Sequence, residues 1–235
     1  MAQLYTGTSG FAYPNWKPRF YPADLPEKKF LEHYASRLRS VEINYTFRRL
    51  PAAGTLENWV KATPAGFRFA CKANQRITHI QRLKDVSSAV ELFLRSIDPL
   101  RSARRLGPIL FQLPPNLKFD MALLGDFLKL LPADLRFTIE FRHPSWLVDS
   151  VYDALKKQNI SLCVVESEKL EIPEVITADF VYYRLRKSEY SEEERKAIAE
   201  RAGELLAQAK DLYLYFKHEE TPEGALYAEE LAARL

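Results

Sequence analysis

The sequence has 235 residues, of which 47% are hydrophobic, 28% charged and 12% aromatic. This is the composition of a folded globular protein, and its 8 glycines exclude a collagen-like or linker-rich chain. The formal net charge of +3 is too small to indicate a nucleic-acid-binding protein by itself.

Several features of the chain predict a cytoplasmic protein with no membrane partner. No apolar run approaches the roughly 18 residues that a membrane-spanning helix needs. Residues 1–10 lack the basic region and apolar stretch of a secretion signal. Cys71 and Cys163 lie in apolar segments without a CxxC or Cys/His spacing, which favours buried free thiols over a disulfide or a zinc site.

Charge is distributed unevenly along the chain. From Ser188 onwards there are 12 acidic and 6 basic residues, whereas the preceding residues include 28 basic and 19 acidic ones. The basic part can attract an anion. The alternative is an ordinary solvated surface with an acidic helix at one end.

Eight short segments rich in β-branched or aromatic residues predict strands. They are residues 4–8, 41–44, 67–73, 108–113, 137–141, 161–165, 180–185 and 212–217. Helical patterns follow at residues 27–38, 55–62, 86–100, 121–131, 146–158, 191–210 and 223–235. Residues 166–179 contain Pro173 and show weak periodicity, so we expect a loop there.

Helix boundary signals support this alternation. Pro26 can open the first helix, Asp120 can cap the fourth, and Ser191 with Glu194 forms a capping box. Strands that alternate with helices imply parallel pairing through right-handed crossovers. We therefore predict an α/β protein whose residues 1–235 form a single (β/α)8 TIM barrel, with a weak or missing helix after strand six.

An open doubly wound sheet is the alternative fold. Such a sheet usually carries a glycine-rich first turn, and Gly7, Ser9 and Gly10 do not make a GxGxxG motif. The sequence has no P-loop either, so no nucleotide cofactor motif is present.

In a (β/α)8 barrel the active groups come from the carboxyl ends of the strands. Polar residues occur at nearly every predicted strand end: Glu42 and Asn44, Lys72, Gln112, Glu140 and Arg142, Glu166, Arg184 and Arg186, and Lys217 with His218. A carboxylate buried in an apolar strand needs a partner, because an unpaired charge there costs several kcal/mol or shifts its pKa. The cations at the other strand ends are suitable partners. A salt-bridge network that simply closes the barrel mouth is the alternative to a functional site.

The residue types suggest roles in acid/base chemistry. Glu140 and Glu42 are the candidate acid and base, and His143 is the alternative proton carrier. Arg142 and Lys72 suit a phosphate or carboxylate. These residues are compatible with a hydrolase, a lyase or an isomerase. A glycoside hydrolase is one such enzyme, and its mechanism depends on the separation of the two carboxylates.

The remaining candidate residues would bind substrate. Asn44 and Gln112 can orient hydroxyl groups, and Arg184 can add positive charge. Tyr13 and Trp16, together with Phe11, can form an apolar wall against a sugar face, or can instead cap the barrel.

Lys72 has two alternative roles. A depressed pKa would let it form a Schiff base with a carbonyl substrate. Pairing with Glu42 or Glu140 would raise its pKa instead, and we favour pairing.

A divalent metal is possible but not favoured. Glu42, Glu140 and Glu166 with His143 or His218 offer suitable ligands, but their spacing is not diagnostic. The cofactor, if there is one, is not identified by the sequence.

Several motifs resemble those of one family. They are Gly7-Thr8-Ser9-Gly10-Phe11 with Tyr13 and Trp16, Val41-Glu42-Ile43-Asn44 with Thr46-Phe47, Phe69-Ala70 with Lys72, Ile77-Thr78-His79, Leu110-Phe111-Gln112-Leu113-Pro114-Pro115 and Glu140-Phe141-Arg142-His143-Pro144-Ser145-Trp146. Together they resemble the YecE-like family, a group of bacterial and archaeal proteins of unknown function. The resemblance spans nearly the whole chain and implies a TIM barrel, but it brings no reaction, substrate or cofactor.

The chain departs from the family pattern near its C-terminus. It has Arg184-Leu185-Arg186 where the family commonly has Arg-His-Gly, and residues 217–220 replace a frequent Asn-Asn-Asp. These changes bear on any role for the last two loops.

Two classes of function follow from these observations. The first is a protein that binds or transforms a small anionic or sugar-like molecule in a polar pocket at the strand ends. The alternative is a non-enzymatic nucleic-acid or nucleotide binder, suggested by aromatic residues interleaved with Arg48, Arg49, Arg76 and Arg82. The oligomeric state is left open.

Overall fold

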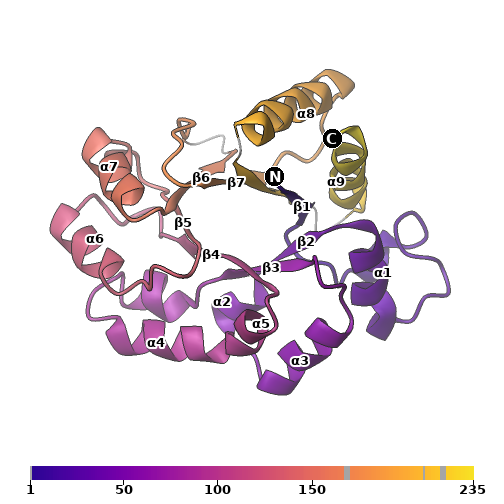
Figure 1. Ribbon diagram of the computed structural model, residues 1–235, viewed down its shortest axis with the longest axis horizontal. Helices are drawn as coiled ribbons and strands as arrows, with labels where there is room; N and C mark the ends of the chain where they lie inside the picture. Colours follow the sequence, from indigo (N-terminus) through magenta and orange to yellow (C-terminus); the bar gives the residue numbers. More distant parts are fainter. Residues whose placement is uncertain (1, 167–169, 209, 218–220) are drawn as a thin grey trace.

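The computed structural model describes residues 2–166, 170–208, 210–217 and 221–235. In these ranges eight parallel strands form a barrel, and helices surround it (Figure 1). The strands are β1 (Leu4–Thr8), β2 (Ser40–Ile43), β3 (Arg68–Lys72), β4 (Leu106–Gln112), β5 (Phe137–Glu140), β6 (Ser161–Val165), β7 (Phe180–Leu185) and β8 (Asp211–Phe216). Every predicted strand is present within two residues at either end, which confirms the (β/α)8 barrel.

Most helices also match the predicted ranges. The α-helices of the described residues are α1 (Phe30–Arg37), α2 (Tyr45–Arg48), α3 (Ala53–Lys61), α4 (Ser87–Ser96), α5 (Asp98–Ser102), α6 (Met121–Leu128), α7 (Asp149–Lys157), α8 (Glu192–Ala207) and α9 (Glu223–Arg234). The predicted helix 86–100 is split into α4 and α5, because Pro99 has no N–H for a continuous helix and its ring clashes with the preceding turn. The caps are confirmed: Asp120 accepts a hydrogen bond from Leu123 N–H, and Ser191 and Glu194 form the capping box.

Short helical turns escaped the sequence analysis. They are η1 (Pro14–Trp16), η4 (Pro144–Trp146), the one-turn α2 and a π-helix, η3 (Arg76–Ile80), whereas η2 (Glu27–Lys29) forms the start of the predicted helix 27–38. Each is too short for a helical period to show in the sequence. Three of them, η1, α2 and η3, follow the first three strands and so lie at the carboxyl end of the barrel.

The segment after β6 is a loop, as predicted. Residues 170–179 contain no helix, so the outer ring has a helix-free stretch between α7 and α8 (Figure 1). The missing helix after strand six is thereby confirmed for the described residues.

The barrel closes weakly between β1 and β2. The other seven neighbouring pairs form parallel ladders, whereas the described backbone pairing on this side is a single bridge from Ser9, directly after β1, to Glu42 in β2. The Tyr34 hydroxyl, from α1, accepts from Thr8 N–H at 2.8 Å and donates to Ser40 O at 3.0 Å. Tyr34 therefore replaces part of the missing ladder with hydrogen bonds to both strands.

Gly7 permits this close approach of β1 to β2. A Cβ atom at Gly7 would lie 1.9 Å from Ser40 O and 2.6 Å from the Tyr34 hydroxyl. Any side chain would force the two strands apart.

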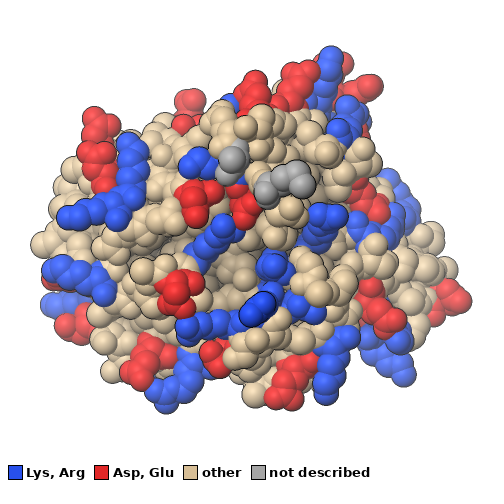
Figure 2. Space-filling model, in the orientation of Figure 1, with Lys and Arg blue, Asp and Glu red and all other residues tan. Residues whose placement is uncertain are grey.

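The amino ends of the strands are closed by aromatic rings and arginines. Tyr5 stacks on Tyr213 with centroids 4.6 Å apart, and Arg68 lies over the Tyr5 ring. Arg136 pairs with Asp211 at 2.6 Å. The strands follow one another clockwise in Figure 1. Because the crossovers between parallel strands are right-handed, this order means that Figure 1 views the barrel from the amino ends of its strands. Figure 2 shows acidic and basic side chains interspersed over the same face.

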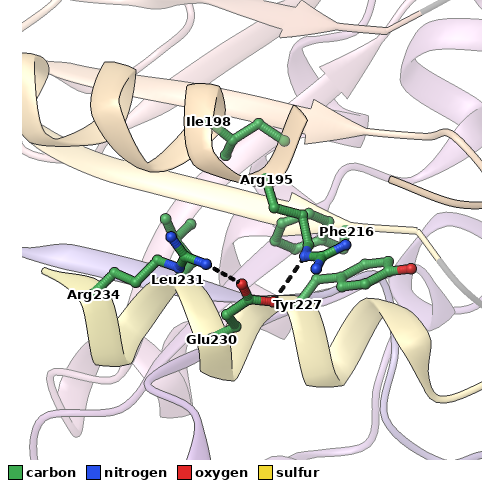
Figure 3. Close-up of a pocket in the computed structure, with 7 residues that line it drawn as sticks. All are labelled: Arg195, Ile198, Phe216, Tyr227, Glu230, Leu231 and Arg234. Carbon is green, nitrogen blue, oxygen red and sulfur yellow. Dashed lines mark hydrogen bonds and ion pairs between the residues drawn. The ribbon is translucent and has the colours of Figure 1, made fainter. Parts of the chain in front are cut away.

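Helices α8 and α9 are joined by an ion-pair cluster against β8 (Figure 3). Glu230 accepts from Arg195 Nε at 2.8 Å and from Arg234 Nη2 at 2.6 Å. The space that these side chains enclose with Phe216 and Tyr227 is about 10 Å³, enough for about one water molecule. This cluster is a structural contact of the barrel wall.

Both cysteines lie in strands of the barrel. Cys71 and Cys163 are buried free thiols, as expected. Within the described ranges, no helix combines the length and the apolar character required to cross a bilayer.

Substituting Gly7 by Ala tests the strand approach. We expect Gly7→Ala to lower the free energy of unfolding by about 3 kcal/mol or more, because the new methyl group collides with the Ser40 carbonyl. Urea unfolding measures the change. The matched control is Gly125→Ala in α6, where a Cβ would meet nothing within 4 Å and should stabilise the helix by up to about 1 kcal/mol. Equal stability of the two variants would contradict the close contact.

Candidate functional site

Charged and polar side chains meet inside the barrel at the carboxyl ends of the strands, here called the rim. At their centre is Arg184, at the end of β7, which is 3% exposed. Its Nε and Nη2 donate to the two oxygens of Glu42 at 2.9 and 2.8 Å, and its Nη1 donates to Glu140 Oε2 at 2.6 Å. Arg184 thus joins carboxylates from β2 and β5 across the barrel. We call Arg184, Glu42, Glu140, Ser9, Tyr182, Gln112 and Lys72 the Arg184 cluster.

Glu42 is saturated with hydrogen bonds. Besides Arg184, it accepts from the Ser9 hydroxyl at 2.7 Å and from the Tyr182 hydroxyl at 2.8 Å, and it has no exposed surface. Burial by itself would raise the pKa of Glu42, but the Arg184 guanidinium and these donors hold it below its ordinary value. A carboxylate that is fully bonded and kept ionised holds its neighbours in position and is poorly suited to donate a proton.

Glu140 extends the cluster toward β3. Its Oε1 accepts from Gln112 Nε2 at 2.8 Å, and Gln112 Oε1 accepts from Lys72 Nζ at 2.8 Å. The register explains the first contact, because Gln112 and Glu140 lie directly opposite each other on β4 and β5. A continuous series of hydrogen bonds therefore runs from Ser9 to Lys72.

The favoured pairing of Lys72 with a carboxylate is wrong. Lys72 Nζ contacts the Gln112 amide and lies 4.1 Å from the Phe47 ring centroid, and no described carboxylate oxygen is within 4.0 Å of it. Burial and the neighbouring Arg184 lower its pKa to about 8, against the weaker opposing effect of Glu42 and Glu140. The physical reason is that Arg184 already occupies both carboxylates.

More cations surround this cluster. Arg142 Nε is 4.0 Å from Glu140 Oε1, and the Arg142 side chain is exposed. Arg186 is half-buried, and burial together with the nearby Arg184 lowers its pKa. The pKa of His79 is lowered too, by burial and then by Lys72 and Arg142. These mutual effects show that positive charge accumulates on this side of the rim.

The loop after β3 has an unusual backbone. The π-helix η3 begins four residues after Lys72 and is followed by positive φ angles at Arg82 (52°), Leu83 (67°) and Asp85 (52°). Leu83 is buried, and a large side chain rarely adopts such a φ. Residues held in this way are concentrated at functional sites. The loop also carries His79, whose ring packs edge-on against Phe47 at 4.9 Å.

Two of the predicted site residues face other contacts. His143 Nδ1 accepts from Ser145 N–H at 3.2 Å and lies 2.8 Å from the Ser145 hydroxyl, so its described contacts cap η4 and do not reach the carboxylates. Asn44 precedes α2, where its carbonyl accepts from Phe47 N–H at 3.1 Å. The structure thus brings together Glu42, Lys72, Gln112, Glu140, Arg142 and Arg184, and places His143 and Asn44 outside the hydrogen-bonded cluster.

The aromatic residues after β1 pack mainly against one another. Trp16 is completely buried and stacks on Tyr21 with centroids 5.8 Å apart. Tyr13 packs on Trp16 at 5.0 Å, and its hydroxyl donates to Ser9 O at 3.1 Å. In this structure Trp16 therefore offers no surface to a ligand, which matches the capping alternative.

The candidate metal ligands are dispersed. Glu166 Oε2 accepts from Arg186 N–H at 2.8 Å and also from the Tyr190 hydroxyl, so it fastens the loop after β7. His218 lies outside the described residues. Among residues 2–166, 170–208, 210–217 and 221–235, no group of three or more His, Cys, Asp or Glu side chains is placed to hold a metal ion.

The sequence analysis missed two ligands of Glu42, namely Ser9 and Tyr182. Tyr182 precedes Arg184 by two residues on β7, so strand periodicity placed both on one face and was the available signal. The candidate site does not coincide with the open groove of about 470 Å³, which lies between α4, α5 and the start of β4. We locate the candidate site by its charges and its position at the strand ends, and the predicted polar pocket there stays a prediction.

Comparisons with known proteins agree with the barrel. The family model described as "Protein of unknown function DUF72" matches residues 5–235. The UPF0759 protein YunF of Bacillus subtilis (strain 168) is 29% identical over 156 residues, which cover 64% of this chain and 54% of that protein. The UPF0759 protein YecE of Escherichia coli (strain K12) is 30% identical over 144 residues, which cover 61% and 50%. The chain spans about half the length of these curated relatives.

Solved structures give the same result. A DUF72 family protein from Thermotoga maritima has a TM-score of 0.87 and 29% sequence identity, with 98% of each chain covered. A DUF72 family protein from Enterococcus faecalis has a TM-score of 0.82 at 20% identity, covering 98% of this chain and 96% of that one, and supports the fold alone. The YecE-like resemblance is thereby confirmed.

The lowered pKa of Glu42 predicts an acid-sensitive contribution to stability. A carboxyl whose pKa is lower in the folded state stabilises the fold above its ordinary pKa of 4.5, and this contribution is lost as the pH falls through the folded value. We expect Glu42→Gln to cost about 3 kcal/mol or more at pH 7, because the Gln amide NH2 group cannot accept the hydrogen bonds that one Glu42 oxygen receives and the buried ion pair with Arg184 is lost. The difference in free energy of unfolding between Glu42→Gln and the wild type should become smaller below pH 4.5.

Urea unfolding between pH 7 and pH 3 measures this. The control is Glu91→Gln, which removes an exposed partner of Arg95 and should give a curve parallel to the wild type. If the free energies of unfolding of Glu42→Gln and the wild type differ by a constant amount down to pH 3, the lowered pKa of Glu42 is refuted.

Proposed function

The chain belongs to the DUF72 family of proteins of unknown function, and from this premise we propose that it binds a small anionic molecule at the rim. A phosphate or carboxylate group of this molecule is held by Lys72, Arg142 and Arg186. A sugar phosphate or a small organic acid has the required chemistry.

The observation that carries this proposal is an excess of positive charge around Glu140. Among the described residues, Glu42 and Glu140 are the acidic groups inside the Arg184 cluster, and Arg184 binds both, whereas Glu166 accepts from the Arg186 N–H and the Tyr190 hydroxyl at the loop after β7. Lys72, Arg142 and Arg186 then supply three more cations in the same region. An anion placed among them would relieve their mutual repulsion, which is the condition for favourable binding.

The position of these cations supports binding of a small molecule. They stand at the carboxyl ends of β3, β5 and β7, the end of a (β/α)8 barrel at which ligands bind in enzymes of this architecture. Arginine offers a planar fork for two oxygens, whereas lysine acts as a point charge. Two arginines and one lysine suit a group with three oxygens, such as a phosphate.

Sulfate tests the proposal, because it imitates phosphate and carries two charges throughout the useful pH range. We expect sulfate to raise the melting temperature and to bind measurably by calorimetry, with a stabilisation of about 2.7 kcal/mol at one hundred times Kd. Arg142→Ala and Arg186→Ala should each weaken binding by about tenfold. The control is Arg101→Ala, at an exposed ion pair with Asp134 before β4. Equal weakening by Arg101→Ala, or no binding by the wild type, would contradict the proposal.

The pKa of Lys72 gives a separate pH prediction. Lys72 is charged below its pKa of about 8 and loses its charge as the pH rises through this value. Sulfate affinity of the wild type should therefore fall between pH 7 and pH 9.5, with a midpoint at or above 8 because the bound anion itself favours the charged amine. The sulfate affinity of Lys72→Arg should change little between pH 7 and pH 9.5, because arginine keeps its charge. A fall of the same size in Lys72→Arg would show that another group titrates.

The alternative partner is distinguished in the same experiments. A single-stranded oligonucleotide would contact several phosphates, so its affinity would decrease steeply with sodium chloride concentration. Oligonucleotide binding that survives Arg142→Ala and Arg186→Ala, with no binding of sulfate, would favour nucleic acid over a small anion.

A further inference from the structure

Lys72 is held in an unusual setting for a lysine at the end of a barrel strand. Its Nζ donates to the neutral Gln112 amide at 2.8 Å and lies 4.1 Å from the Phe47 ring centroid. The Phe47 ring is held in turn by the edge-on contact with His79. These contacts orient the amine, and both contacting groups are uncharged.

Charged groups of both signs face Lys72, and burial acts on its pKa together with them. They are Arg184 and Arg186 from β7 and its end, Glu42 from β2, Glu140 and Arg142 from β5 and its end, and His79 from η3. Burial and the arginines outweigh the carboxylates and give a pKa of about 8. At pH 7.5 about a quarter of the Lys72 amines are then neutral, against roughly one in a thousand for an ordinary lysine.

We propose that Lys72 is a nucleophile that forms a Schiff base with the carbonyl group of a small anionic aldehyde or ketone. This inference rests on the proposed function, because Arg142 and Arg186 would hold the acid group of the substrate. A 2-oxo acid and a phosphorylated aldehyde share the necessary chemistry, namely a carbonyl carbon close to an anionic group.

The step balances without any oxidant or metal. The lone pair of the neutral Nζ attacks the carbonyl carbon, and a carbinolamine forms when a proton moves from nitrogen to oxygen. The carbon–oxygen bond then breaks, and the oxygen leaves as water with the second proton of the amine. The product is an imine, which becomes a cationic iminium by taking one proton from solvent.

The surroundings suit this product. The iminium retains one positive charge where Lys72 carried one, so Glu140 and Glu42 remain compensated. The strained loop after β3, with η3 and the positive φ angles at Arg82, Leu83 and Asp85, holds His79 beside Phe47. Arg82 fixes this loop further by donating to Asn116 Oδ1 at 2.9 Å. A rigid wall therefore stands next to the amine.

Reductive trapping tests the proposal. The protein is incubated at pH 7.5 with sodium cyanoborohydride and either pyruvate or its neutral ester, methyl pyruvate. A second pair, glycolaldehyde phosphate and glycolaldehyde, distinguishes a phosphate from a carboxylate. Peptide mass spectrometry then gives the rate of modification at each lysine. Lys129, which is exposed directly after α6 and paired with Asp126, is the internal reference.

We expect one of the anionic probes to modify Lys72 at least ten times faster than it modifies Lys129. The same anionic probe should also modify Lys72 faster than the matching neutral probe does. Sulfate should slow this modification. Lys72→Arg retains the charge and removes the nucleophile, so it should lose the fast modification. Lys129→Arg should change neither result.

Each contrary outcome identifies which proposal fails. Modification of Lys72 no faster than Lys129, together with normal sulfate binding, overturns the Schiff base and leaves the anion site standing. Fast modification of Lys72 that is equal for charged and neutral probes and insensitive to sulfate overturns the anionic substrate class and the proposed function with it. Absence of both sulfate binding and fast modification overturns both proposals.

Discussion

The buried pairing of one guanidinium with two carboxylates governs the carboxyl end of this barrel. Removing Arg184, Glu42 and Glu140 from water is costly, and the cost is offset only when their hydrogen bonds are nearly complete. Arg184 meets this condition by reaching from β7 to β2 and β5 at once. The strands must therefore keep their spacing for the three charges to remain compensated. Shape and charge at the rim are coupled through this one side chain.

The coupling also explains why positive charge collects nearby. The three innermost charged groups sum to one negative charge, which attracts cations to the strand ends. Lys72 contacts Glu140 only indirectly, through the Gln112 amide. Arg142 and Arg186, which follow β5 and β7, bring more positive charge than is needed to balance that one negative charge. Glu42 contributes mainly by holding Arg184 in place, with Ser9 and Tyr182 as its other donors. Chemistry at the rim then depends on groups that are less completely bonded than Glu42, and Lys72 is foremost among them.

Much of this arrangement could be predicted from residue types and strand periodicity. Apolar runs located all eight strands, and the position of Glu42, Glu140 and Arg184 near the ends of three of them placed these residues at the same end of the barrel. The contacts of Lys72 could not be predicted, because they depend on register: Gln112 is opposite Glu140, whereas Lys72 is opposite Leu110. The role of Trp16 was ambiguous for a similar reason, since an aromatic residue after a strand can face a ligand or the core. The π-helix η3 carries no periodic signal that a sequence pattern could reveal.

The pairing of the first strand with the last has a consequence during synthesis. Leu4 is matched with Leu212, and β1 has only a single bridge to its neighbour β2. At the usual speed of translation, about 5–20 residues per second, β1 waits roughly 10–40 seconds on the ribosome before its main partner exists. The nascent chain must carry an open curved sheet with an unmatched first strand through this interval, and such edges are prone to wrong pairing. The barrel is thus a structure that can be completed only after β8 has been made.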